Sequence, residues 1–282
     1  MEIGSRAVPP LDATFRLSMG YWYSESNSND CIFFSVEEKR YYELNIHVDK
    51  RSTCWGSSEG WLMMAHPLTR KFLVNPISGE KVRLPPQNIL PIKKFIVSTS
   101  PMSSTSARVA VLHAHESRIS TCLLGDKSWT NMNAEKSSKY DRYRYRDILI
   151  EEGGRGDCLA QEELDNSMVE EKTFLLKFKN EIFMSVVTCT KERRLLLKCY
   201  IYKNIDKHWI PCNNMGDLTM FISTECYKIV VSNEESIFRR NSVYYIDSGM
   251  RKLFEFCLDD GSSIDLKDFE DFYPRMWFFP ST

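Results

Sequence analysis

Short runs of hydrophobic residues alternate with polar turns along most of the chain. The apolar runs 31–36 and 41–46 flank the charged residues 37–40, a pattern that predicts a β-hairpin. Successive side chains of a strand point to opposite faces, so short alternating runs favour strands. Further strands are predicted at residues 60–66, 71–74, 81–84, 107–114, 118–124, 128–130, 172–178, 181–188, 194–202, 208–210, 218–223, 227–231, 242–247, 252–258 and 263–266.

Helical periodicity is weak throughout. No segment keeps a helical hydrophobic period over twelve residues, and the nearest approach is residues 158–172. That stretch is acidic and follows the glycine-rich residues 153–156, so we interpret it as an insertion loop near residues 152–171. The chain is therefore predicted to be all-β.

The predicted strands fall into a repeated unit. An apolar strand, a polar turn and a short strand carrying Trp or Leu recur at a spacing of about 40 to 55 residues, the range of β-propeller blades. Stacking four-stranded sheets in a ring buries both faces of each sheet and leaves short edges. We predict a β-propeller of about six four-stranded blades, with five or seven also open. The propeller is assigned to residues 31–282, after a partly irregular N-terminal extension at residues 1–30.

Composition narrows the class of protein. Of the 282 residues, 43% are hydrophobic and 27% charged, and the net charge is -1, so no overall field favours nucleic acid or an anionic membrane. The nine cysteines are scattered and none forms a CxxC pair. We find neither a signal peptide nor an apolar span of about 18 residues. These features predict a monomer with free thiols in the cytoplasm or nucleus, without a cofactor or a membrane partner.

Several segments together resemble a known family. They are residues 33–36, 54–62, 72–80 and 82–86 near the start, and residues 241–247, 254–261 and 277–280 near the end. In these residues the chain resembles the plant F-box-associated family of unknown function 295, also called the KIB-type β-propeller family. The resemblance implies a β-propeller, usually joined to an N-terminal F-box that docks a ubiquitin-ligase scaffold.

The expected F-box is not recognisable here. An F-box is a helical module of about 40 residues, whereas the residues before position 31 contain Pro9, Pro10 and an Asn/Ser-rich run at 24–29, which disfavour helix. We therefore do not expect docking to a ubiquitin-ligase scaffold. A propeller-only member of the family and a truncated gene product both fit this observation.

Two motifs could carry site chemistry. The glycine-rich residues 56–60 could cradle a phosphate, but Trp61 begins a strand instead of the helix that a phosphate loop needs, so a tight turn is favoured. His113 and His115 lie on one face of a predicted strand and would make half a metal site. No third ligand is assigned, and a pair at the surface or rim is favoured. No metal site or catalytic residue is therefore predicted.

Arginine and tyrosine alternate at residues 140–147. On a strand, Arg142, Arg144 and Arg146 would share one face, and Tyr143 and Tyr145 the other. This pattern suits a protein-binding rim, single-stranded nucleic acid, or a solvated strand with its tyrosines in the core. We take the five residues as the candidate partner-binding site, and the near-zero net charge disfavours RNA.

The sequence favours a non-enzymatic protein-interaction module that resembles the substrate-recognition domain of plant F-box proteins. Its protein partner is not identified. A propeller hydrolase or a sugar-binding propeller that uses a central channel remains the main alternative, because several blades can place carboxylates there. RNA contact through residues 140–147 remains a third possibility.

Overall fold

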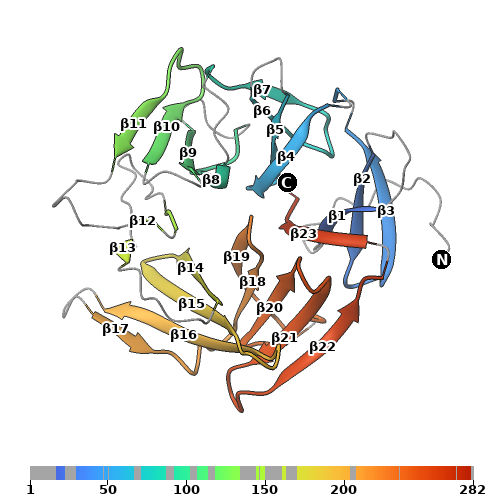
Figure 1. The fold of residues 1–282 in the computed structure, drawn as a ribbon, viewed down its shortest axis with the longest axis vertical. Coiled ribbons are helices and arrows are strands. Elements are labelled where there is room, and N and C mark those ends of the chain that lie inside the picture. Colours follow the sequence, from blue (N-terminus) through green and yellow to red (C-terminus); the bar gives the residue numbers. More distant parts are fainter. Residues whose placement is uncertain are drawn as a thin grey trace.

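The chain folds into a ring of β-sheets (Figure 1). The computed structural model describes residues 17–22, 30–46, 48–49, 51–66, 71–86, 92–101, 107–113, 118–133, 144–145, 147–149, 161–162, 170–203, 208–234, 236–270 and 272–280. These residues form strands and turns without a helix, which confirms the all-β prediction. No helix long and apolar enough to cross a membrane occurs in this described part.

Three four-stranded sheets are formed by the first half of the chain together with one C-terminal strand. The first contains β1 (Leu17–Trp22), β2 (Asp30–Ser35), β3 (Arg40–Asn45) and β23 (Phe272–Phe278). The second contains β4 (Thr53–Ser58), β5 (Trp61–Ala65), β6 (Phe72–Val74) and β7 (Lys81–Arg83). The third contains β8 (Ile92–Val97), β9 (Arg108–His113), β10 (Arg118–Leu123) and β11 (Thr130–Asn133). Neighbouring strands in all three are antiparallel.

Three further sheets complete the ring. A short sheet contains β12 (Arg144–Tyr145) and β13 (Gln161–Glu162). The next contains β14 (Glu170–Phe178), β15 (Glu181–Cys189), β16 (Leu195–Lys203) and β17 (His208–Pro211). The last contains β18 (Leu218–Ile222), β19 (Tyr227–Val231), β20 (Ser242–Asp247), β21 (Lys252–Cys257) and β22 (Ser263–Asp268).

The prediction of about six four-stranded blades is wrong for the described residues. Four sheets of the described residues have four strands, one has five and one has two. The fifth strand arises because β18 pairs antiparallel with β19 on one side and parallel with β20 on the other. This arrangement places β19 inside the ring, close to its axis (Figure 1). Of the two-stranded sheet, only β13 falls within residues 152–171, where an insertion loop was expected, and most of those residues lie outside the described ones.

The two ends of the chain close the ring in one sheet. Strand β1 pairs with β2 on one side and with the C-terminal β23 on the other, with a register shift after Met19. Part of the expected N-terminal extension therefore belongs to the first sheet. Backbone pairing of β1 with β23 within this one sheet closes the ring, which the sequence could not reveal.

The β4–β5 hairpin corrects the interpretation of the glycine-rich segment. Glu59 and Gly60 form its turn, with φ values of 49° and 74°. Gly56 instead lies at a bulge within β4, with φ at 146°. A Cβ at Gly56 would lie 3.0 Å from the carbonyl oxygen of Glu225 and 3.2 Å from the Phe95 ring. Gly56 is therefore required by the close approach of β4 to β8 and to the turn before β19, and not by the β4–β5 turn.

The segment after β6 confirms the predicted turn at residues 75–80. The Asn75 side-chain oxygen accepts hydrogen bonds from the backbone N–H groups of Ile77 and Ser78, at 2.9 and 3.1 Å. The Asn75 N–H also donates to the Glu80 carbonyl at 2.9 Å. An Asn side chain that satisfies nearby backbone donors stabilises this kind of chain reversal.

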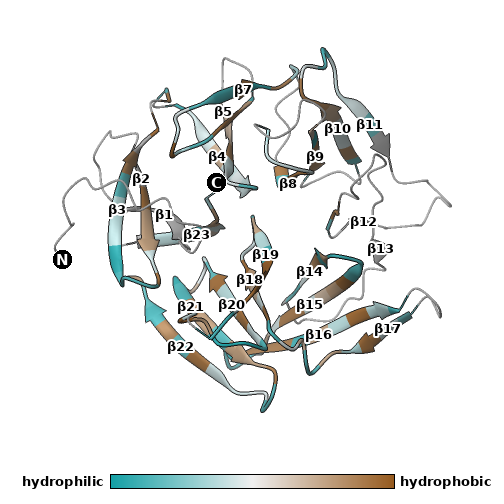
Figure 2. Cartoon of the chain, turned by 180° about the vertical axis from the view of Figure 1, so that it is seen from behind, coloured by the Kyte–Doolittle hydropathy of each residue, from teal (hydrophilic) through white to brown (hydrophobic). Residues whose placement is uncertain are grey.

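Hydrophobic clusters fill the spaces between neighbouring sheets. Trp61 is fully buried and packs with Phe95 between the second and third sheets. Leu176, Phe183 and Tyr245 belong to a cluster between the β14–β17 sheet and the five-stranded sheet. Outer strands such as β3 and β7 are more hydrophilic (Figure 2). The core is thus divided among the blade interfaces, as the propeller architecture requires.

Candidate functional site

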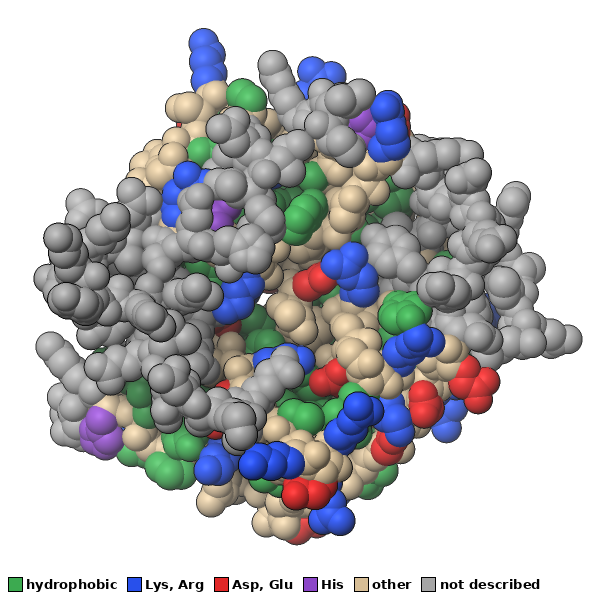
Figure 3. All heavy atoms as spheres, viewed as in Figure 1, with side chains coloured by type: hydrophobic (Ala, Val, Ile, Leu, Met, Phe, Trp, Pro, Cys, Tyr) green, Lys and Arg blue, Asp and Glu red, His purple; other side chains and the backbone are tan. Residues whose placement is uncertain are grey.

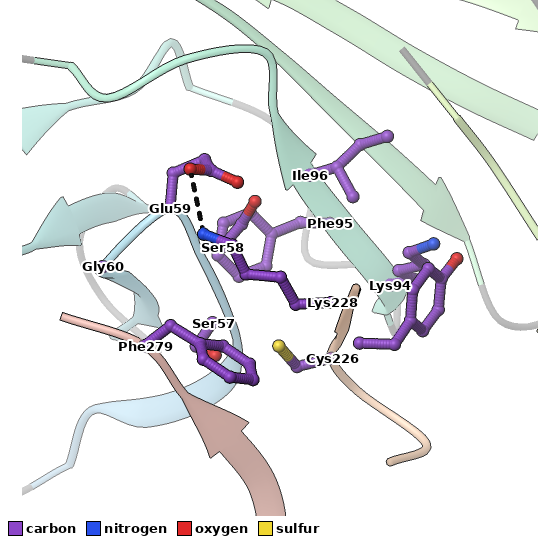
Figure 4. Close-up of a pocket in the computed structure, with 11 residues that line it drawn as sticks. Ser57, Ser58, Glu59, Gly60, Lys94, Phe95, Ile96, Cys226, Lys228 and Phe279 are labelled. Carbon is purple, nitrogen blue, oxygen red and sulfur yellow. Dashed lines mark hydrogen bonds and ion pairs between the residues drawn. The ribbon is translucent and has the colours of Figure 1, made fainter. Parts of the chain in front are cut away.

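A small hollow lies on the ring axis and is lined by strands of four sheets. The β4–β5 turn contributes Glu59, β8 contributes Lys94, β19 contributes Tyr227 and Lys228, and the segment after β23 contributes Phe279 (Figure 4). Its volume is about 30 Å³. Since one water needs roughly 10–15 Å³ by this measure, the hollow accommodates about two waters. It is too small for a sugar or another organic substrate in this conformation.

An ion pair lies at the open end of the hollow. Lys228 Nζ lies 3.4 Å from Glu59 Oε2 and 5.6 Å from the centre of the Phe279 ring. Both charged side chains are partly exposed, at 36% for Lys228 and 43% for Glu59. The space-filling view shows basic and acidic side chains around the narrow axial opening (Figure 3). An exposed pair of this kind contributes at most about 1 kcal/mol to stability.

Lys94, which lines the hollow, belongs to a buried ion pair. Lys94 Nζ lies 2.7 Å from Asp147 Oδ1 and donates to the carbonyl of Ile148 at 3.0 Å. The ammonium also lies 3.3 Å from the centre of the Tyr227 ring. The second oxygen of Asp147 accepts the N–H of Leu175 at 2.7 Å. Four elements from different parts of the ring thus meet at this pair.

The environment of this pair shifts both pKa values. Burial lowers the pKa of Lys94 to about 8, although the adjacent Asp147 carboxylate opposes the shift. Burial raises the pKa of Asp147, opposed by Lys94 and by the N–H groups of Leu175 and Ile148. The shared contacts compensate for much of the cost of burying two charges. Since both groups are engaged with protein partners, the geometry favours a structural role over proton transfer.

A second polar cluster joins the closing sheet to β4 and to the turn before β19. Arg275 pairs with Glu225, with its Nε 3.2 Å from Oε1. The Trp277 indole donates to the Ile222 carbonyl at 3.0 Å, and the Ser57 hydroxyl donates to the Trp277 carbonyl. Burial raises the pKa of Glu225, and the adjacent Arg275 guanidinium opposes this rise. These contacts fix neighbouring sheets around the axis.

A much larger groove lies at the perimeter, between the β14–β17 sheet and the five-stranded sheet. Its volume is about 520 Å³, and it is lined by residues 195–200 of β16, residues 211–213, residues 256–258, Gly261 and Ser263. By volume, this groove rather than the axial hollow could accept a side chain or a peptide.

Exposed apolar side chains concentrate in the same part of the ring. In the described ranges, the large hydrophobic residues that are substantially exposed are Leu196, Val231, Ile237, Ile264 and Leu266, at 40–57%. All belong to β16 or to the five-stranded sheet and its connections. Leu196 lines the groove and Ile264 follows the lining residue Ser263. Clustered exposed apolar side chains mark interaction surfaces more often than scattered ones do.

The predicted Arg/Tyr site is only partly described. Arg144 and Tyr145 form β12, which pairs with Glu162 and Gln161 of β13. Arg142, Tyr143 and Arg146 lie outside the described residues. The backbone of β12 agrees with a strand at this position, and the assignment of the five residues to partner binding stays a prediction.

His113 is buried, although the sequence favoured a position at the surface or rim. His113 is 2% exposed, and its Nε2 lies 2.8 Å from the Ser120 hydroxyl. Burial, together with Arg118 and Lys71, lowers the pKa of His113 to about 4, so the ring is neutral near pH 7. His115 lies outside the described residues. No group of three His, Cys, Asp or Glu side chains in the described ranges could hold a metal ion.

Sequence reasoning missed Lys94 and Asp147, the most deeply buried charges near the axis. Lys94 stands in the apolar stretch Ile92–Val97 and Asp147 precedes the apolar residues 148–150. A charge at an inward position of a strand signals a buried partner. The partner itself could not be found, because 53 residues separate the two in the chain.

The fold and its closure define this protein as a β-propeller. The sequence model described as "KIB1-4 beta-propeller" matches residues 33–263, most of the chain. The chain therefore belongs to the KIB1-4 β-propeller family, which confirms the resemblance found in the sequence.

Individual relatives are more distant. An Arabidopsis thaliana protein, named as an F-box protein, is 30% identical over 87 residues, which cover 29% of this chain and 21% of that protein. The solved β-propeller domain of Cps50 (Swd1) from Myceliophteria thermophila is 9% identical, with a TM-score of 0.38, and the match covers 90% of this chain and 93% of that one. The N-terminal domain of Nup159 gives a TM-score of 0.33 at 8% identity, over 89% of this chain and 71% of that one.

Proposed function

We propose that this propeller is a non-catalytic protein-interaction module that binds its partner at the perimeter of the ring. One observation carries the proposal. The groove beside β16 measures about 520 Å³ and has the exposed Leu196 in its wall, whereas the axial hollow measures about 30 Å³. Partner binding on a rigid scaffold needs an accessible apolar surface, and the groove offers one.

The chemistry of the axis supports the non-catalytic part of the proposal. The buried charges Lys94 and Asp147 bind each other and nearby backbone groups, and Glu225 is engaged by Arg275. A catalytic acid or base needs to reach a substrate within hydrogen-bond distance. A sugar-binding or hydrolytic function at the axis would require the channel to open by several times its present volume.

The family relationship suggests what kind of interaction this is. By analogy with the F-box protein that it resembles in part, the propeller would recognise a protein destined for modification. The ring is built of strands, whereas an F-box is a helical module. Recognition is therefore the part of the function that we assign to the ring itself.

Affinity purification with matched variants tests the proposal. Leu196→Lys places a charge on the groove wall, and Ile237→Lys places one at an equally exposed residue outside its lining. Ile237 precedes Phe238, which packs in a different hydrophobic cluster. We expect Leu196→Lys to lose specific partners that the wild type and Ile237→Lys retain. Equal capture by all three proteins, or turnover of a small substrate by the pure propeller, would contradict the proposal.

A further inference from the structure

The floor of the perimeter groove is a continuation of the hydrophobic core. Leu195 and Phe256 are at most 9% exposed and belong to the cluster between the two sheets. Leu197 and Leu258 are partly buried, pack on that cluster and also line the groove. The core therefore reaches the surface here without a covering strand among the described residues. A partner side chain could extend the cluster outward and remove this apolar surface from water.

An acidic turn borders one wall of the groove. Asp259 and Asp260 stand between the lining residues Leu258 and Gly261, in the turn from β21 to β22, and both are exposed. The Asp259 carboxylate accepts a hydrogen bond from the Asn241 amide at 2.6 Å, and that of Asp260 accepts one from the Ser262 N–H at 2.9 Å. Hydrogen bonds from Ser262 lower the pKa of Asp260 to about 2. The turn thus presents two carboxylates in defined positions.

The opposite wall carries a different charge. Lys198 of β16 is exposed and is the charged side chain among the lining residues. The two carboxylates and Lys198 therefore belong to different elements of the groove, and Arg239 is the basic residue that acts on Asp260. In a segment bound in the groove, a basic side chain is attracted beside the acidic turn and repelled beside Lys198.

We propose that the groove binds an extended peptide segment with an apolar side chain on the core floor and a Lys or Arg beside Asp259 and Asp260. The inference rests on the proposed interaction function and specifies the chemistry of the partner. The exposed side chain of Leu196, which lines the groove, extends the apolar contact beyond the floor. Nucleic acid is disfavoured at this place, because the acidic turn repels phosphates.

Synthetic peptides test the proposal on the full chain. The probe is a fluorescein-labelled nonapeptide of alternating Leu and Lys, compared with one in which Glu replaces every Lys and one in which Ser replaces every Leu. We expect the Leu/Lys peptide alone to raise fluorescence anisotropy saturably at low salt. Binding should weaken as salt screens the carboxylates, over a Debye length of about 10 Å at 0.1 M.

Charge reversals on the two walls should act in opposite directions. We expect Asp260→Lys to weaken binding of the Leu/Lys peptide about fivefold to tenfold, and Lys198→Glu to strengthen it about twofold to threefold. Asp126→Lys is the matched control, because Asp126 is an exposed turn aspartate that accepts the Leu123 N–H at 2.8 Å in another sheet. It should leave the affinity within about twofold.

Three outcomes would overturn the proposal. They are absence of binding, equal binding of the Leu/Glu peptide, and equal weakening by Asp126→Lys and Asp260→Lys. Circular dichroism melting of each variant shows whether the fold is retained. The interaction function has its own test in the capture of partners by the Leu196→Lys and Ile237→Lys variants. Selective loss of partners from Leu196→Lys together with any of these three outcomes would refute the peptide chemistry alone.

Discussion

The axis and the perimeter of this ring use charged and apolar residues in opposite ways. At the axis, Lys94 and Asp147 are almost completely buried, and each is engaged by the other and by backbone groups. At the perimeter, Leu196 is about half exposed in the wall of a groove of about 520 Å³. Charged groups are therefore buried at the axis, and apolar groups are exposed at the perimeter.

This difference separates residues that hold the fold from residues available for binding. Removing one partner of a buried ion pair is costly, because the other charge is then left buried without compensation. An exposed leucine contributes little to folding, so its presence beside a groove points to a partner. The expected effects of substitution should therefore fall steeply from the axis to the groove.

Asp147→Ala should have the largest effect. It leaves the Lys94 ammonium buried without its carboxylate and removes the acceptor of the Leu175 and Ile148 N–H groups. We expect a loss of about 3–5 kcal/mol in the free energy of unfolding, measured by urea denaturation. The double variant Lys94→Met, Asp147→Leu should recover more than half of this loss, because it removes both charges together. A loss below about 1 kcal/mol from Asp147→Ala would show that the pair does not stabilise the axis.

Gly56→Ala should have the next largest effect. The added Cβ would meet the Glu225 carbonyl at 3.0 Å, and the backbone φ of 146° disfavours any side chain. We expect a loss of about 2–3 kcal/mol by the same measurement. Gly125→Ala is the control, because its φ is 94° but nothing lies within 4 Å of the added Cβ. It should cost about 1 kcal/mol, and equal losses at the two sites would argue against the close approach.

Substitutions at Tyr227 should separate the ring from its hydroxyl. The Lys94 ammonium lies 3.3 Å from the ring centre, whereas the buried hydroxyl has no hydrogen-bond partner among the described residues. Tyr227→Leu should cost about 1–2 kcal/mol through loss of the cation–π contact, and Tyr227→Phe should be neutral or stabilising. The two melting curves give the comparison. A larger loss from Tyr227→Phe than from Tyr227→Leu would reveal a role for the hydroxyl.

Leu196→Lys should have the smallest effect on folding. Because Leu196 is 53% exposed, we expect its free energy of unfolding to stay within about 0.5 kcal/mol of the wild type. Leu195→Lys is the informative neighbour, since Leu195 is 9% exposed and belongs to the core cluster, so it should destabilise the fold by several times more. Similar losses from both would remove the distinction between floor and wall of the groove.

Local patterns were sufficient to predict most hairpins and their turns. Residues 172–178 and 181–188 were expected as strands. They form the antiparallel pair β14 and β15, in which Phe178 and Glu181 lie opposite each other on either side of the turn. Asn75 was expected to reverse the chain and does so through its side-chain oxygen. Gly56 was expected in the turn, but it lies at the bulge of β4. Because glycine adopts positive φ readily in both features, its presence in the sequence does not distinguish them.

The candidate sites were harder to predict. The free thiols expected from the sequence are found at the seven cysteines whose side chains are described, and burial raises the pKa of Cys54 to about 12. His113 was expected at the surface, but the stacking of the second and third sheets buries it. The perimeter groove was not expected at all. Its walls come from β16 and β21, and the sequence did not reveal how closely these strands approach.

The sequence by itself determined most of the strands and turns, the β-propeller class and the membership of the KIB1-4 β-propeller family. These depend on contacts between residues close in the chain, which alternation and turn chemistry record directly. Only the tertiary structure decided the closure of the ring by β1 and β23, the insertion of β19 toward the axis, and the pairing of Lys94 with Asp147. Each depends on how sheets pack across long sequence separations, which local hydrophobic patterns do not specify. The same packing separates a closed polar axis from an open apolar groove.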